Sequence, residues 1–407
     1  MLGFLQDSHA SKSVWEKTLT FSLLGSLLFG QISISAVQSF LAIALIAWIL
    51  LVVKKRIAVA FPSFFWPLAG YAALSLISSA ASVDPALSLR ASRKLLLYAL
   101  VPIVYTAFRK TKEITLAYTA LLASSLVNGL YSTIYFIFRA YPGQRVKGFM
   151  GHYMTQAGIL ALFGSLALGM ILLGRGKDKP AWAAGLGLSS AALAFTLTRS
   201  AWVGLAVALC VIILLWKPKA FVLVPVVAGL IFFAAPPAIK GRIRSIFSLR
   251  DSSNIARVEY LGAGLKIIRD FPLLGTGPDT VDIVFQNPKY GLSEISRKNV
   301  HLHNNVIQIA AERGLAALAA WLAFIIMAFL ALIRLLGEKN SEVRAPAAGA
   351  IAALAALCAA GFFEYNFGDS EVTTLLLFII TLPFALERVR GPKPETGSFS
   401  ARDRQKT

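Results

Sequence analysis

Two of the four histidines of the chain, His301 and His303, stand beside amide residues at the end of a long polar interruption in an otherwise hydrophobic sequence. A neutral imidazole can accept a hydroxyl proton near neutral pH, and a general base contributes roughly 10²- to 10⁴-fold to a rate. His303 is therefore the first candidate for a catalytic base. The alternative interpretation is a histidine at the membrane interface that caps or orients the next helix.

The His-x-His spacing also permits a metal pair, because alternate residues of an extended segment point the same way. No third ligand stands nearby in the sequence. We therefore expect neither a metal site nor a cofactor.

Two arginines are further candidates. Arg199 lies in the segment 196–202, at the junction of two apolar runs, where an arginine is costly unless it is paired or reaches the headgroups. Arg257 falls in the first turn of a helix that we expect to be capped within residues 252–254 and to end at Asp270. A cation is mildly unfavourable there, but a helix N-terminus beside an arginine suits a phosphate. For each arginine a structural role is as well supported as a functional one.

Two more polar segments interrupt the apolar runs. Residues 139–152 are basic and include Arg145 and Lys147, whereas residues 364–371 are acidic and include Glu364 and Asp369. The two segments could pair with each other as a structural seam, or they could bind phosphate and sugar hydroxyls, respectively. The sequence supports both interpretations equally.

Composition defines the surroundings of these residues. The chain has 407 residues, of which 57% are hydrophobic and only 15% are charged, whereas about a quarter of residues are charged in a soluble globule. Apolar runs near the roughly 20-residue length of a helical membrane span recur, without the alternation of a membrane barrel. We predict an all-α polytopic membrane bundle of about twelve transmembrane helices, near residues 18–33, 36–53, 63–81, 92–108, 114–138, 153–173, 181–197, 201–216, 220–238, 314–336, 345–363 and 372–386.

Clusters of lysine and arginine fall on alternate connections, so the positive-inside rule predicts that both termini are cytoplasmic. Merging the first two spans would leave eleven helices and move the N-terminus across the membrane. The predicted organisation is transmembrane helices over 1–237, a large helical extracytoplasmic loop over 238–313 between helices nine and ten, transmembrane helices over 314–390, and a disordered cytoplasmic tail over 391–407. No cleavable signal peptide is evident.

The loop over 238–313 is rich in basic residues, Arg269 among them, although outward loops are usually poor in them. An anionic, phosphate-bearing ligand would explain why this loop is basic. The formal net charge of +20 is spread in short clusters between apolar runs, which favours membrane lipids and an anionic lipid substrate over nucleic acid. Cys210 and Cys358 lie inside apolar runs, and we expect no disulfide.

The residues His303 and Asn304, followed after nine residues by Gly314-Leu-Ala-Ala317, resemble the histidine motif of O-antigen ligases, whose final glycine is alanine here. The segments 198–200, 270–277 and 364–369 and the residue Arg257 are also similar to the pattern of the O-antigen ligase and polymerase superfamily. The likeness covers the whole predicted layout, and its specific motifs lie between Arg145 and Asp369.

The resemblance implies a metal-independent, inverting glycosyltransferase of the bacterial inner membrane whose active site faces the periplasm. Its donor would be a glycan on undecaprenyl pyrophosphate, and its acceptor a hydroxyl of the lipid A core. His303 would deprotonate or orient that hydroxyl, while Arg199 and Arg257 would hold the pyrophosphate. His301, Asn304, Arg145, Lys147, Arg269, Glu364 and Asp369 complete the expected substrate-binding set.

Three alternatives stay open at the level of sequence. A polysaccharide polymerase would use a second lipid-linked glycan as its acceptor, and a protein O-oligosaccharyltransferase would modify serine or threonine. A secondary transporter would place broken helices in matched halves near the membrane midplane. No matched pair of interrupted runs is present in the sequence.

Overall fold

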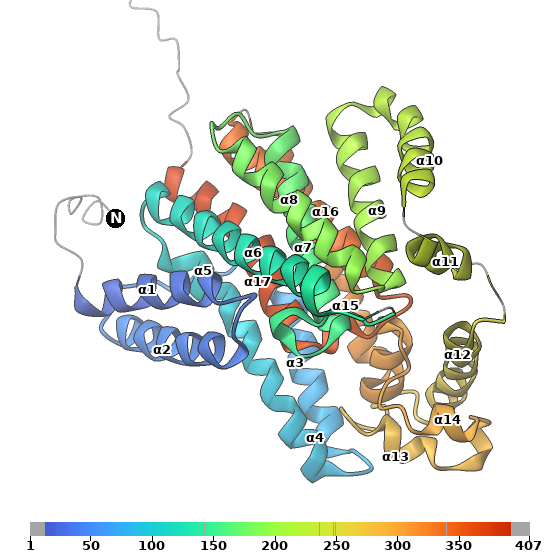
Figure 1. Ribbon diagram of the computed structural model, residues 1–407. Coiled ribbons are helices and arrows are strands. Elements are labelled where there is room, and N and C mark those ends of the chain that lie inside the picture. The colour runs from blue at the N-terminus through green and yellow to red at the C-terminus, as the bar shows by residue number, and fades with distance from the viewer. Residues whose placement is uncertain are drawn as a thin grey trace, which may run out of the picture.

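The computed structural model describes residues 13–141, 143–235, 237–246, 248, 250–338 and 340–391, and every secondary-structure element within these ranges is a helix (Figure 1). The elements in the first half are α1 (Val14–Leu28), α2 (Ile34–Val53), α3 (Phe65–Ala80), α4 (Pro85–Ala91), η1 (Ser92–Ala99), α5 (Leu100–Ala107), α6 (Thr111–Arg139), η2 (Gly148–Met150), α7 (Tyr153–Leu172), α8 (Lys179–Phe195) and α9 (Arg199–Trp216). The second half contains η3 (Pro218–Leu223), α10 (Val224–Ala234), α11 (Pro237–Ser245), α12 (Ser252–Asp270), α13 (Val281–Phe285), η4 (Pro288–Tyr290), α14 (Glu294–Arg297), α15 (Asn305–Leu336), α16 (Ser341–Ala360), η5 (Asn366–Gly368) and α17 (Ser370–Arg390). The leader before residue 13 and the tail from residue 392, which we expected to be disordered, lie outside the described residues.

Seven of the described helices are long and apolar enough to cross a membrane, namely α2, α6, α7, α9, α15, α16 and α17. Shorter apolar helices cover residues 65–80 and 218–234. The chain is therefore a polytopic membrane protein. Each of the twelve expected spans overlaps a helix, but a count of twelve crossings and the sidedness of the connections stay predictions.

The first two expected spans are separate helices, so the alternative of a single merged helix is wrong. α1 ends at Leu28 and α2 begins at Ile34, and Ser33 caps α2 by accepting a hydrogen bond from the backbone N–H of Ala36. The two helices are separated by the turn over residues 29–33, at whose end the Ser33 side chain satisfies a free backbone N–H group of α2.

The centre of the bundle is α16, which packs against α7 and α9 through small residues. A Cβ atom added to Gly169 of α7 would lie only 2.4 Å from the backbone nitrogen of Gly349 of α16. One added to Gly204 of α9 would lie 2.8 Å from the carbonyl oxygen of Ala356. Membrane helices associate through such close approaches, because lipid tails remove the hydrophobic drive that packs helices in water. This dense centre is a rigid support for the residues at its ends.

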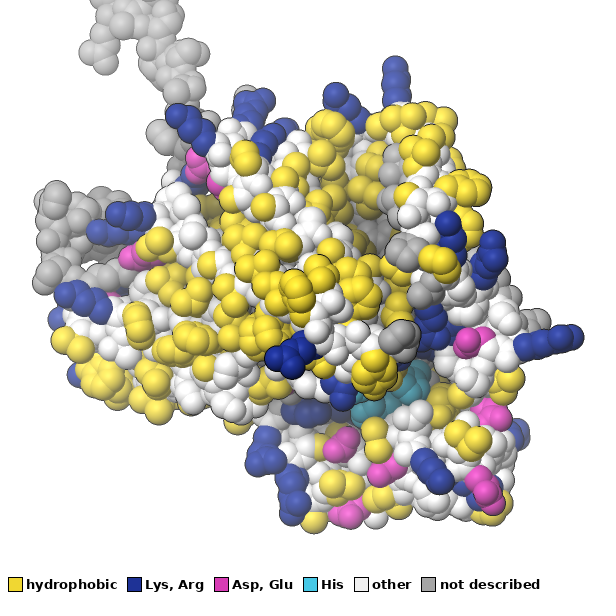
Figure 2. Space-filling view, in the orientation of Figure 1, with side chains coloured by type: hydrophobic (Ala, Val, Ile, Leu, Met, Phe, Trp, Pro, Cys, Tyr) yellow, Lys and Arg dark blue, Asp and Glu magenta, His cyan; other side chains and the backbone are white. Residues whose placement is uncertain are grey.

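The segment from α12 to the start of α15 folds into a lobe below the bundle with its own small core (Figure 1). Tyr260, Ile267, Phe285 and Leu302 are buried together there. In Figure 2 hydrophobic side chains gather over the bundle, whereas acidic side chains are frequent over the lobe, and histidine is visible at the border between them. The lobe therefore presents polar surface where the bundle presents surface suited to lipid.

α12 differs in detail from the helix expected from the sequence. It ends at Asp270 as predicted, but its N-cap is Asp251, whose carboxylate accepts from the backbone N–H of Ser253, and not a residue within 252–254. An acidic side chain at the cap complements the helix dipole. The earlier start places Arg257 in the second turn of the helix and not in the first.

α15 contains a break at Gly314, where the predicted span begins, and a shorter helical segment from Asn305 precedes the break. Gly314 has φ 80° and ψ 171°, which only glycine adopts readily. The bend frees the carbonyl groups of Ala311 and Glu312, which accept from the backbone N–H groups of Thr276 and Gly277 at 2.9 and 2.8 Å. The 270–277 segment and the Gly314 motif, which are distant in sequence, thus form one joint between lobe and bundle.

Candidate active site

His303 and Glu364 form a hydrogen-bonded pair at the border between bundle and lobe. Nδ1 of His303 lies 3.0 and 3.1 Å from the two carboxylate oxygens of Glu364, and both side chains are largely buried. Because a carboxylate only accepts hydrogen bonds, Nδ1 carries the proton and donates it. The lone pair of the neutral ring is then on Nε2, as a general base requires.

Backbone geometry and two asparagines position this pair. His303 has φ 50°, in the left-handed region that is uncommon outside glycine. Asn304 follows as the N-cap of α15 and accepts from the backbone N–H of Ile307. Asn305 connects this helix start to the loop that carries Glu364, since its N–H donates to the carbonyl of Gly361 at 2.7 Å and its amide donates to the side chain of Asn366 at 2.7 Å.

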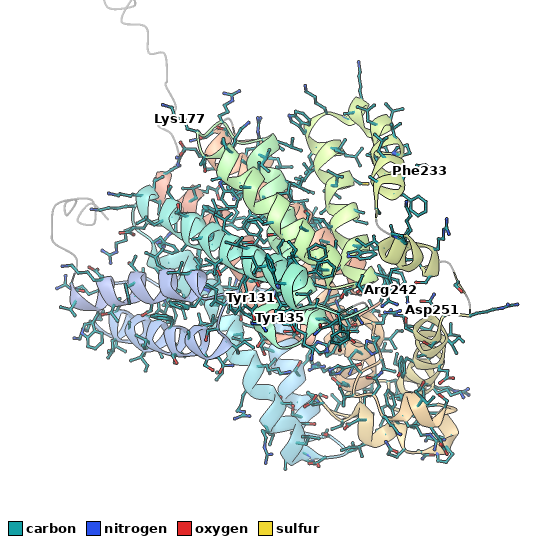
Figure 3. All side chains as sticks on the ribbon, in the orientation of Figure 1. Tyr131, Tyr135, Lys177, Phe233, Arg242 and Asp251 are labelled. Atoms are coloured by element: carbon teal, nitrogen blue, oxygen red, sulfur yellow. The ribbon has the colours of Figure 1, made fainter. Side chains whose placement is uncertain are left out.

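His303 lines a cavity of about 320 Å³ together with arginines from four parts of the chain. Arg145 comes from the loop before α7, Arg199 from the start of α9, Arg242 from α11 and Arg257 from α12. Figure 3 places Arg242 and Asp251 close to the lobe. Asp251 lines the same cavity, whereas Glu364 lies outside it and contacts it through His303. We call this space the arginine cavity.

Arg199 is the most buried of the four and is held by the segment that joins α11 to α12. Its Nη1 donates to the carbonyl and the hydroxyl of Ser245 at 2.7 and 2.8 Å. Its Nη2 donates to Asp251 at 2.8 Å, to Asn254 at 3.1 Å and to the hydroxyl of Ser253. Arg199 therefore fixes the N-terminus of α12 in addition to lining the cavity.

Arg145 and Arg242 stabilise the turn between α8 and α9. Arg145 donates to the carbonyl of Thr196 at 2.9 Å, and both arginines donate to the carbonyl of Leu197 at 3.3 Å. Leu197 has φ 51°, so a non-glycine residue holds a left-handed turn here. The guanidinium of Arg145 also lies 3.4 Å from the ring centroid of Tyr153, which is a cation–π contact.

The electrostatics of the cavity follow from burial and from charge. Burial lowers the pKa of Arg145 to about 10 and lowers that of Arg257, yet both remain cations at neutral pH. Burial alone would raise the pKa of Glu364, but its hydrogen bond to His303 and the nearby charges, including that of Arg257, bring the pKa below its usual value. Glu364 is thus an anion beside the imidazole at neutral pH.

His301 faces a different space from His303. It lines a cavity of about 390 Å³ with Lys94, Glu364 and Asp369, and its ring meets that of Tyr365 edge to face at 5.4 Å. Burial lowers the pKa of His301. The alternative of a shared metal pair assumed an extended segment, whereas the left-handed backbone at His303 breaks the alternation, and the two imidazoles line separate cavities. Within the described residues no group of three or more His, Cys, Asp or Glu side chains could hold a metal ion.

The remaining residues expected to bind substrate differ in whether they line a cavity. Asp369 caps α17 and accepts from the hydroxyl of Thr155 at 2.5 Å, in the His301 cavity. Asn304 is occupied as the cap of α15 and donates to the carbonyl of Phe362. Lys147 and Arg269 are exposed, and among the described residues neither lines the arginine cavity. The basic and acidic segments do not pair directly in the hydrogen bonds of the described chain, although Thr155 bonds Asp369.

Sequence reasoning did not single out three residues that complete the site. Arg242 lines the arginine cavity, and the ring of Tyr260 lies 5.5 Å from that of His303. Asn305 joins the start of α15 to the loop that carries Glu364. Arg242 belongs to a basic cluster in the sequence, and Asn305 adjoins the histidine motif, so both carried a signal. Tyr260 carried none beyond helical spacing.

Residues 184–322, which carry Arg199, Arg257 and His303, match the family model described as O-antigen ligase. The match supports membership of the O-antigen ligase superfamily and agrees with the motifs. The chain matches no curated protein. The family match suggests a glycosyltransferase-like enzyme with activity of the O-antigen ligase or polymerase type.

Proposed function

We propose that the protein moves a glycan from undecaprenyl pyrophosphate to a hydroxyl of the lipid A core, at the periplasmic face of the bacterial inner membrane. The observation that carries the proposal is the His303–Glu364 pair at the wall of a cavity with four arginines. A general base beside a cationic cavity suits transfer from a pyrophosphate donor, since the base serves the acceptor and the cations serve the leaving group.

The proton transfer follows from the tautomer of His303. Nε2 takes the proton of the acceptor hydroxyl as its oxygen bonds to the anomeric carbon of the donor. Glu364, fixed at Nδ1, stabilises the imidazolium that forms. The oxygen attacks opposite the departing pyrophosphate, so the anomeric configuration inverts.

The bond between the anomeric carbon and the phosphate oxygen breaks, and its electron pair stays on undecaprenyl pyrophosphate. Arg257 and Arg145 would contact the growing negative charge, with Arg242 beside them. Arg199, which already donates to Ser245 and Asp251, would contribute its charge and keep α12 in place. Preorganised donors of this kind contribute several kcal/mol to a transition state that develops charge, and pyrophosphate needs no acid to protonate it.

The orientation rests on the charge of the connections. Figure 3 places Lys177 at the end of the bundle away from Arg242 and Asp251. The cluster with Lys177 would face the cytoplasm under the positive-inside rule, which would put the arginine cavity on the periplasmic side. The lobe that carries Arg257 and His303 is long, and long loops cross the membrane despite their charge.

The test is reconstitution of the purified protein in liposomes with a defined undecaprenyl-pyrophosphate glycan and lipid A core. We expect glycosylated lipid A core from wild type, and a loss of at least about 10²-fold in rate for His303→Ala with an unchanged melting temperature. Gln286→Ala, an exposed polar residue of the lobe, is the control and should retain wild-type transfer. Wild-type transfer by His303→Ala would exclude the general base.

A competition in the same liposomes decides the acceptor. Lipid A core, a second lipid-linked glycan and an exported serine-rich protein are supplied together, and the glycosylated product is identified by mass spectrometry. Product on the lipid A core supports the ligase, whereas product on the second donor or on the protein would replace it with a polymerase or a protein transferase.

A further inference from the structure

One face of α12 departs from the polar surface of the lobe. Its apolar residues follow one another at intervals of three or four and are 46 to 68% exposed, namely Ile255, Val258, Leu261 and Leu265. Intervals of this size keep side chains on one side of a helix, so these four residues form a continuous apolar stripe. We call it the α12 stripe.

The opposite face of α12 already has its partners. Tyr260 and Ile267 are buried in the core of the lobe. Gly264 lies so close to α15 that an added Cβ atom would be 2.2 Å from the side chain of Ile307. On the side of the stripe, by contrast, a Cβ atom added to Gly262 would meet no described atom within 4 Å. The stripe is therefore available to something other than the described part of the chain.

The acidic side chains of α12 are turned away from the stripe. Between residues 252 and 270 only Glu259 and Asp270 are acidic. Glu259 accepts from the hydroxyl of Ser293 at 2.8 Å, and Asp270 bonds the turn over residues 289–290 at 3.0 Å, so both point back into the lobe. Arg269 follows the end of the stripe by four residues and lies on the same side of the helix. It is exposed and forms no ion pair with a carboxylate of the described residues.

The stripe continues an edge of the molecule that suits lipid. Figure 1 shows α10, α11 and α12 following one another along this edge. α10 is apolar, with Leu230 66% and Phe233 78% exposed, and Figure 3 places Phe233 at the edge. Between α10 and α12, the short helix α11 carries the cations Lys240 and Arg244 in addition to Arg242. Lysine and arginine between an apolar helix and an amphipathic one are typical of the level of the lipid headgroups.

Charge favours a membrane surface over a second copy of the chain as the partner of the stripe. A second copy would add another arginine to the contact and no carboxylate. Anionic phospholipid headgroups would instead compensate both Arg269 and Lys240. A helix with an apolar face and flanking cations inserts that face roughly 5–10 Å into the boundary between headgroups and acyl chains.

We propose that the α12 stripe docks the lobe on the membrane by inserting into the surrounding leaflet, and that anionic phospholipids hold it there through Arg269 and Lys240. The same helix carries Arg257, and its cap Asp251 bonds Arg199. Docking therefore sets the arginine cavity at the level of the lipid phosphates. The lipid composition of the leaflet then controls the position of α12.

Fluorescence quenching in nanodiscs that each hold one full-length copy tests the docking. A fluorescent amino acid replaces Val258 or Leu265 of the stripe, or Ile283 of α13 as the matched control. Ile283 is 45% exposed, and Figure 1 places α13 at the end of the lobe away from α11. The bilayer contains phosphatidylglycerol and phosphatidylcholine, with or without bromine on the acyl chains near the headgroups. We expect bromine to lower the fluorescence about twofold at positions 258 and 265 and to leave it unchanged at 283.

The charge of the lipid and the charge of the protein are then varied separately. A bilayer of phosphatidylcholine alone should reduce the quenching at position 258 by about half or more, and so should Lys240→Glu/Arg269→Glu in the mixed bilayer. Lys240→Arg/Arg269→Lys keeps the charge and should retain the quenching. A melting temperature equal to that of wild type confirms the folding of each variant.

Three results would overturn the proposal. Absence of quenching at position 258, or equal quenching at 283, would exclude insertion of the stripe. Equal quenching at 258 in the neutral and mixed bilayers would exclude the anionic lipid. A benzophenone at position 258 that joins two copies of the protein in liposomes would assign the stripe to a second copy. Because none of these measurements requires glycan transfer, their failure leaves the proposed function intact, and loss of the proposed function leaves the docking intact.

Discussion

Replacing Glu364 by glutamine tests the central pair of the site with almost no change in shape. The amide oxygen of the introduced glutamine can still accept from Nδ1–H of His303, so the ring orientation and the tautomer are retained. What is lost is the negative charge at 3.0 Å from Nδ1. The substitution therefore isolates the electrostatic part of the contact.

The magnitude follows from Coulomb's law. Two unit charges 3.0 Å apart interact by about 5 kcal/mol at an effective dielectric constant of about 20. Because only part of the proton charge has reached the imidazole in the transition state, roughly half of this applies, or about 2.5 kcal/mol. At about 1.4 kcal/mol per factor of ten, kcat should fall on the order of 10²-fold.

The assay is initial-rate transfer in liposomes with donor and acceptor varied separately. We expect kcat to fall while the KM for the donor stays unchanged, because Glu364 acts through His303 and does not line the arginine cavity. The matched control is Glu294→Gln, an exposed carboxylate of the lobe, which should leave kcat unchanged. In the double variant His303→Ala/Glu364→Gln, the second change should add little.

A kcat within about threefold of wild type for Glu364→Gln would refute the reasoning. Loss of the same size in both the wild-type and the His303→Ala backgrounds would also refute it, since Glu364 would then act independently of His303.

Four further predictions concern the joint, the arginine network, pH and metal. Gly314→Ala places a Cβ atom 1.9 Å from the carbonyl oxygen of Leu273 at φ 80°, so the free energy of unfolding should fall by about 3 kcal/mol or more. The control Gly262→Ala, on the open surface of α12, should raise that free energy by up to about 1 kcal/mol. Equal melting temperatures for the two variants would contradict this prediction. Arg199→Lys keeps the charge but loses the simultaneous hydrogen bonds to Ser245 and Asp251, so the rate of amide hydrogen exchange at the start of α12 should rise. An unchanged exchange rate would show that these hydrogen bonds are not needed to hold α12. Burial lowers the pKa of His301, so the folded state favours the neutral imidazole and the free energy of unfolding should fall as the pH drops below 6.5. The variant His301→Gln should show a smaller fall between about pH 7 and 5.5. A fall identical to that of wild type would exclude His301 as its source. Transfer should survive thorough chelation, and a loss that zinc restores would contradict the metal-free mechanism.

Much of the helical layout could be predicted from the sequence because apolar length and turn chemistry are local properties. The ends of α2, α7 and α12 agree with the expected ends to within one residue, since charged clusters or Asp270 end each apolar run. The helical conformation of residues 305–313, before the break at Gly314, could not be predicted, because polar and charged residues interrupt their apolar ones, unlike in a membrane span. Their helical conformation depends on the cap at Asn304 and on the joint around Gly314.

The sequence by itself determined the class of protein, because composition is a property of the chain, and motif spacing led to the proposal of His303, Arg199 and Arg257 as site residues. Only the tertiary structure decided that Glu364, 61 residues further along, bonds Nδ1 of His303. It also decided that His301 and His303 line separate cavities, and that Arg199 is held by Ser245 and Asp251. These relations depend on how helices pack and on a left-handed backbone at one residue, and no local pattern of residues encodes either.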